Sequence, residues 1–91
     1  MMENDYAWHD YYKNISRKLY SMGIENSILK KESIKYSGKN PVIFIHPFSA
    51  KDKELIRKLE TISDFTGFKS MNKDDGTYDY TGWFQQKQTI I

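Results

Sequence analysis

The chain has 91 residues and a mass of 10.8 kDa, which is enough for one small core and one domain, residues 1–91. Aromatic residues make up 15% of it, and this content argues against disorder although the mean hydropathy is −0.75 and 29% of the residues are charged. The lack of cysteine excludes disulfides, thiolate metal sites and cysteine nucleophiles.

The first predicted element is a helix from about Asn4 to Met22. Apolar and aromatic side chains recur along it at spacings of three and four, which places them on one helix face. These side chains are Trp8, Tyr11 or Tyr12, Ile15, Leu19 and Met22. Asn4 can cap the start of the helix, and Gly23 can adopt the left-handed conformation that ends helices.

A β-hairpin is expected next. Its strands are Ile28 to Tyr36 and Val42–Ile45, joined by the turn residues Ser37–Pro41. Because Val42–Ile45 lacks polar alternation, we expect both of its faces to be covered and place it at the centre of the sheet.

A second helix is predicted to begin at Ser49, which forms an approximate capping box with Asp52. Glu54 lies four residues before Lys58, an orientation that favours an ion pair on a helix. Gly67 is expected to end the helix. Its apolar stripe is Leu55, Ile56, Leu59 and Ile62, continued by Phe65.

Two further strands, Phe68 to Met71 and Thr77 to Gln85, flank an acidic turn at residues 72–76, and residues 86–91 form a tail that frays or extends the last strand. The element order is therefore α-β-β-α-β-β. It predicts an α+β fold with two amphipathic helices packed on a small mixed sheet of three to four strands. The β-α-β step through the second helix should be right-handed.

The net charge of +2 is unevenly distributed along the chain, because residues 13–58 carry eleven Lys or Arg against four acids. On the first helix, Tyr6, Lys13, Arg17 and Tyr20 share a polar stripe with Asp10. Such a stripe is typical of a solvated helix face, of a protein interface, or of a surface that binds single-stranded nucleic acid.

His46 precedes the predicted start of the second helix, where free N–H groups attract anions and Lys51 and Lys53 would add to the attraction. No glycine-rich phosphate loop accompanies it, so a structural turn is the better interpretation. His9 and His46 are the only histidines, and no spacing brings them together with carboxylates. We therefore expect no metal, no cofactor and no catalytic residue.

The run from Val42 to Leu55 resembles the first strand, loop and helix start of TIR-type domains, which bind nucleotides and in some cases cleave NAD. The resemblance spans 14 of the 91 residues. The chain that follows is too short for the rest of such a sheet and shows no later helix with a catalytic glutamate, so we carry over no activity.

Trp83 and Phe84 are neighbours on the last strand and must face opposite sides of it. At a sheet edge, one ring would be exposed and would anchor a partner or a homodimer. In a central strand both rings would be buried under helices, and this second arrangement is the one that we expect.

The leading hypothesis is a non-catalytic protein that acts by protein–protein contact, such as a bacterial or phage-encoded regulator or inhibitor. We expect a cytoplasmic protein with no membrane segment, because the longest apolar run is too short to cross a bilayer and the N-terminus is acidic. The predicted partner-binding residues are Tyr6, Lys13, Arg17, Tyr20 and Trp83. The alternatives are an enzyme at the His46 turn and a nucleic-acid-binding module. The residues of that module would be Lys13, Arg17, Lys18, Lys30, Lys31 and Lys35.

Overall fold

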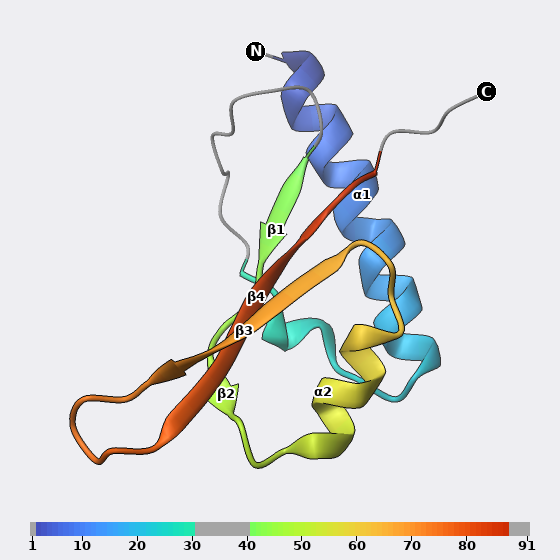
Figure 1. Cartoon of the computed structure of the whole chain (residues 1–91). Coiled ribbons are helices and arrows are strands. Elements are labelled where there is room, and N and C mark those ends of the chain that lie inside the picture. Colours follow the sequence, from blue (N-terminus) through green and yellow to red (C-terminus); the bar gives the residue numbers. More distant parts are fainter. Residues whose placement is uncertain (1, 31–40, 88–91) are drawn as a thin grey trace.

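The computed structural model describes residues 2–30 and 41–87, with side chains from Trp8 onward. Two helices lie on one face of a four-stranded antiparallel sheet, which confirms the α+β fold (Figure 1). The elements are α1 (Met2–Ser21), the 3₁₀ helix η1 (Asn26–Ile28), β1 (Val42–Phe44), β2 (Phe48–Ser49), α2 (Lys53–Glu60), β3 (Phe65–Met71) and β4 (Tyr78–Gln85). Neither α1 nor α2 combines the length and the apolar character that a membrane crossing requires.

The helix α1 has the buried face that the spacing predicts, since Tyr11, Ile15 and Leu19 lie in the core. It begins at Met2, so Asn4 lies inside the helix and the prediction that it caps the start is wrong. Two side chains tie the helix to the strands and their loops. The indole Nε1 of Trp8 donates to the Val42 carbonyl at 3.1 Å, and the Tyr11 hydroxyl donates to Asp64 at 2.7 Å.

The end of α1 is a Schellman motif around Gly23, as the sequence predicts. Gly23 has a φ of +79° and donates its N–H to the Tyr20 carbonyl at 3.0 Å. The N–H of Ile24 donates to the Leu19 carbonyl at 2.9 Å, and both side chains are buried in the core. The chain therefore leaves α1 with its last carbonyls satisfied and turns back toward the sheet.

The central strand of the sheet is β4, so the prediction that Val42–Ile45 is central is wrong. β1 and β2 pair with one edge of β4 and β3 pairs with the other, all antiparallel, so the sheet is not mixed. Phe44 lies opposite Trp83 and Phe48 opposite Tyr80, so one extra residue is accommodated between β1 and β2. The helix α2 joins β2 to β3, which lie on opposite sides of β4.

The predicted first hairpin is only partly within the described residues. Leu29 forms an antiparallel bridge with Ile45, and the Lys30 N–H donates to the Phe44 carbonyl at 2.9 Å. This short segment follows η1 and pairs with the chain at the end of β1. The remainder of the predicted strand and most of the turn, residues 31–40, lie outside the described residues.

The helix α2 is shorter than predicted. Asp52 caps its start by accepting from the Leu55 N–H at 3.3 Å, whereas Ser49 pairs with Asp79 in the sheet. The helix ends at Glu60, and the predicted continuation through Phe65 to Gly67 forms β3 instead. Both errors have one cause: pairing with β4 satisfies the backbone at each side of the helix.

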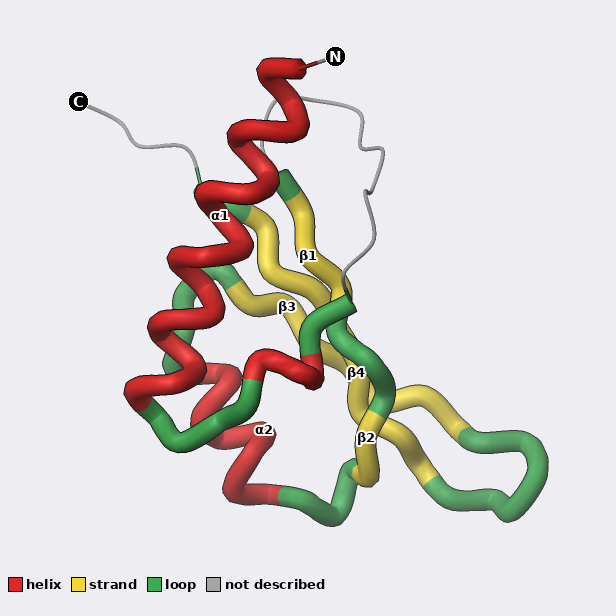
Figure 2. Tube along the Cα trace, turned by 180° about the vertical axis from the view of Figure 1, so that it is seen from behind, coloured by secondary structure: helices red, strands yellow, loops and turns green. Residues whose placement is uncertain are grey.

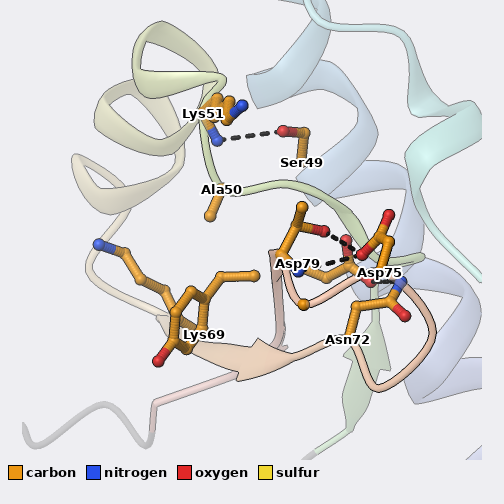
Figure 3. Close-up of a pocket in the computed structure, with 10 residues that line it drawn as sticks. Ser49, Ala50, Lys51, Lys69, Asn72, Asp75 and Asp79 are labelled. Atoms are coloured by element: carbon orange, nitrogen blue, oxygen red, sulfur yellow. Dashed lines mark hydrogen bonds between the residues drawn. The ribbon is translucent and has the colours of Figure 1, made fainter.

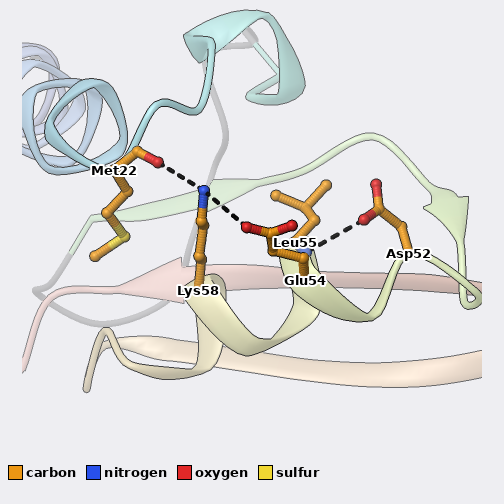
Figure 4. Close-up of polar contacts among 5 residues, drawn as sticks. All are labelled: Met22, Asp52, Glu54, Leu55 and Lys58. Carbon is orange, nitrogen blue, oxygen red and sulfur yellow. Dashed lines mark hydrogen bonds and ion pairs between the residues drawn. The ribbon is translucent and has the colours of Figure 1, made fainter.

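The predicted ion pair on α2 is present, with Lys58 Nζ 3.7 Å from Glu54 Oε2. The same Nζ donates to the Met22 carbonyl at 2.9 Å, just beyond the end of α1 (Figure 4). The lysine therefore ties the two helices together.

Gly67 and Gly82 lie opposite each other in the β3–β4 ladder. A Cβ on Gly82 would collide with the Thr66 carbonyl oxygen and lie 2.8 Å from the Gly67 Cα. The rings of Phe65 and Tyr80 stack over this glycine pair, with centroids 6.2 Å apart and an interplanar angle of 24°. Close approach of backbone and rings thus requires glycine on both strands.

We expect Gly82→Ala to lower the free energy of unfolding by about 3 kcal/mol, because the added methyl group must push the backbone of β3 away. Gly23→Ala is the matched control. Its Cβ would meet nothing within 4 Å. The substitution should therefore lower the free energy of unfolding by only about 1 kcal/mol, the cost of a left-handed backbone at a residue other than glycine. Urea unfolding of the two variants measures the difference, and equal losses would contradict the close approach.

Candidate functional site

Three aromatic side chains cross the face of the sheet that the helices leave uncovered. Phe44 from β1, Trp83 from β4 and Phe68 from β3 form this aromatic row. The ring centroids of Phe44 and Trp83 are 6.2 Å apart, and those of Trp83 and Phe68 are 6.0 Å apart. Phe44 is 37% exposed and Phe68 is 46% exposed, while Trp83 between them is half-buried.

The open face exists because α1 and α2 lie on the same side of the sheet, as Figure 2 shows from the helix side. Side chains along β4 alternate between the two faces. Phe84 faces the helices and is fully buried, whereas its neighbour Trp83 lies on the open face. Of the two sequence-based alternatives for Trp83 and Phe84, neither describes the structure: β4 is central, yet only one face is covered by helices.

Polar side chains surround the aromatic row. Register and alternation place Thr66 and Thr81 on the open face beside Trp83 and Phe68, and Lys30 next to Phe44 at the outer edge. An apolar centre with a polar rim is the arrangement that protein interfaces use. The aromatic row is therefore a candidate binding surface.

The predicted partner-binding residues do not come together on this surface. Lys13, Arg17 and Tyr20 are exposed on α1, with Tyr20 at 84%, but this side of the helix faces away from the sheet. Trp83 lies on the opposite face of the molecule. Tyr6 belongs to α1 by its backbone, and its side chain lies outside the described residues.

The cations of the nucleic-acid alternative are separated in the same way. Lys18 is exposed on α1, whereas Lys30 lies at the edge of the open face. Lys31 and Lys35 lie outside the described residues. The structure thus shows no shared basic face within the residues that it describes.

His46 is exposed and its backbone N–H donates to the Ile28 carbonyl at 2.8 Å. Since α2 begins only at Lys53, β2 separates this histidine from the helix start, so His46 does not lie at a helix N-terminus. The same insertion of β2 removes the strand–loop–helix likeness to TIR-type domains. No cluster of three or more His, Asp or Glu side chains suited to a metal ion occurs among the described residues.

A hollow of about 620 Å³ lies between the turn of the β3–β4 hairpin and the loop that follows β2 (Figure 3). Several of its polar side chains bond to other groups of the protein. Asp75 accepts from the Thr77 hydroxyl at 2.7 Å and the Thr77 N–H at 3.0 Å, which holds the pKa of Asp75 below its ordinary value. Ser49 Oγ accepts from the Lys51 N–H at 3.1 Å. These bonds shape the two turns beside the hollow.

A second hollow of about 330 Å³ lies between the end of α1 and the start of α2. Glu25, Asp52 and Glu54 line it together with Lys58. Asp52 caps α2, and Lys58 bonds to Met22 and Glu54, so these two side chains have structural roles.

Two tyrosine hydroxyls are held between helices and sheet. Burial, aided by the hydrogen bond to Asp64, raises the pKa of Tyr11 above its ordinary value. Tyr80 donates to Glu60 at 2.8 Å, and burial followed by this bond raises the pKa of Tyr80 from 10.0 to about 12. Both groups therefore favour the neutral hydroxyl in the folded state.

Because the folded pKa of Tyr80 lies above the unfolded value, its contribution is complete below pH 10 and is lost as pH rises toward 12. We expect the free energy of unfolding to fall in this window, by at most about 1.4 kcal/mol per pH unit for each tyrosine. Tyr80→Phe should make the fall shallower, whereas exposed Tyr20→Phe should not. Urea unfolding across this pH range checks both, and identical profiles for Tyr80→Phe and wild type would contradict the assignment.

The sequence pattern predicted Trp83 as a site residue but did not point to Phe44 or Phe68. The sequence signal for Phe44 is its alternation with the core residues Ile43 and Ile45, whereas the neighbours of Phe68 are Gly67 and Lys69. Alternation shows that the Phe44 ring leaves the core face, but it does not show which strands lie side by side. Comparisons with family models, curated proteins and solved structures find no match to this chain.

Proposed function

We propose that the protein is a non-catalytic binding protein that docks a protein partner on the aromatic row. The supporting observation is the exposure of Phe44 and Phe68 on either side of the half-buried Trp83, on a sheet face that neither α1 nor α2 covers. Trp is enriched among the residues that dominate the binding energy of protein interfaces. It contributes most where neighbouring contacts exclude water. A regulator or inhibitor that acts by occupying its target fits this arrangement.

Charge favours a protein over a nucleic acid as the partner. A single-strand binding surface combines stacking rings with a groove of cations that follows the phosphates. Among the described residues, the ladder positions of the open face carry Lys30 as a cation and Asp79 as an anion. The cations of α1 lie behind the sheet and cannot contact a ligand that stacks on Trp83.

We expect Phe44→Ser to abolish capture of the partner while leaving the fold intact, because the ring is already partly in water. Tyr20→Ser removes an exposed ring from α1, 84% exposed against 37% for Phe44, and is the control for loss of a surface ring outside the aromatic row. The tagged wild type and Tyr20→Ser should retain the same protein from a lysate of the source cells, and Phe44→Ser should lose it. Circular dichroism confirms folding of each variant.

Capture that is unaffected by Phe44→Ser, or that is lost only with Tyr20→Ser, would contradict docking on the aromatic row. Fluorescence anisotropy with labelled single-stranded DNA and RNA across a salt series tests the nucleic-acid alternative. Binding that weakens with salt and depends on Lys13 and Arg17 would favour that alternative.

A further inference from the structure

The outer edge of β3 has backbone groups that are free to pair with another strand. The Asp64 carbonyl accepts from the Gln85 N–H at 3.1 Å, and the Asn72 N–H donates to the Thr77 carbonyl. These two bonds fix the alternation of the β3–β4 ladder: even-numbered residues bond to β4 and odd-numbered residues point away from it. The N–H and C=O groups of Gly67, Lys69 and Met71 therefore face outward.

No backbone or side-chain group in the described part of the chain bonds to these outward groups. The opposite edge of the sheet differs, because residues 28–30 pair with residues 44–46 at the end of β1. The outer part of β3 also extends beyond both helices, as Figures 1 and 2 show. Phe68 and Met71 are 46% and 53% exposed there. An edge of this kind, with neither proline nor a covering segment within the described residues, is open to strand addition.

We propose that two copies of this chain pair antiparallel through β3, with the two-fold axis at Phe68. Phe68 is the midpoint of Phe65–Met71, so this register alone pairs the whole strand with its copy. This register also pairs the outward-facing backbone groups with one another, because Gly67 then exchanges hydrogen bonds with Lys69 of the second copy.

The facing side chains are complementary in this register. On the open face, Phe68 lies directly opposite Phe68 of the second copy, in the closer, non-hydrogen-bonded type of pair. On the helix face, Met71 lies opposite Phe65, which forms a sulfur–aromatic contact. The two aromatic rows then join into one continuous surface across the dimer.

The charge of Lys69 favours this register over the alternative register with its two-fold axis at Lys69. An axis at Lys69 would place two ammonium groups directly opposite each other, which is unfavourable. With the axis at Phe68, each Lys69 instead faces Gly67 of the other copy, which carries no charge. A second copy is therefore the occupant that the edge fits, as isologous pairing requires a self-complementary strand.

Disulfide trapping tests the register, since the natural chain contains no cysteine. In Phe68→Cys the two Cα atoms would lie about 4.5 Å apart, within the range that a disulfide bridges. In Lys69→Cys they would lie about 8 Å apart, which is too far. We expect a disulfide-linked dimer from the first variant and little from the second. Equal or greater linkage through Lys69→Cys, or none through either, would overturn the proposal.

Analytical ultracentrifugation tests the dimer without cross-linking. The apparent mass of the wild type should rise with protein concentration to twice the 10.8 kDa monomer mass. Phe68→Asp should remain a monomer, because two carboxylates would meet at the axis. Phe44→Asp changes the same face one strand beyond β4 and should still dimerise.

A wild type that stays monomeric at every concentration would overturn the proposal. Loss of the dimer in both Phe68→Asp and Phe44→Asp would also overturn it, because it would indicate that two copies associate through their open faces and not through β3. The dimer does not depend on the proposed function. Phe44→Asp should still form the dimer even if it no longer binds the partner, so the dimer and the proposed function can be disproved independently.

Discussion

The two-sided pairing of β4 is the constraint on which the remaining structure depends. Its backbone bonds to β1 and β2 along one edge and to β3 along the other, so one strand aligns the segments that precede and follow α2. The same alignment places Phe84 opposite both Ile43 and Phe65, which brings the centre of the core together. Gly67 and Gly82 allow the close approach of β3 that this alignment needs.

The helices complete the core but cover only one side of the sheet. α1 contributes Tyr11, Ile15 and Leu19, and the short α2 contributes Leu59. Polar ties at Trp8 and Lys58 hold the helices against β1 and against each other. With both helices committed to the same face, the other face keeps rings in contact with water. This asymmetry, and not an unusual side chain, is what creates the candidate binding surface.

Local signals in the sequence predicted the helices and turns better than the pairing of strands. The spacing of Ile15 and Leu19 predicted α1, and Gly23 predicted its end, because both act within one or two helical turns. The start of α2 and the fate of Phe65 were predicted wrongly, since β4 offers these segments hydrogen bonds that no local pattern reveals. Propensity decides a segment only where tertiary contacts do not compete.

The sequence alone determined that a chain of this length and 15% aromatic content forms a small α+β fold, since periodicity and turn chemistry are local properties. It also determined that Trp83 and Phe84 face opposite sides, because alternation is inherent in any strand. Only the tertiary structure decided that β4 is central and that Phe44 and Phe68 flank Trp83. Strand order and register arise from contacts between residues far apart in the chain, and these contacts are set by how the whole core packs.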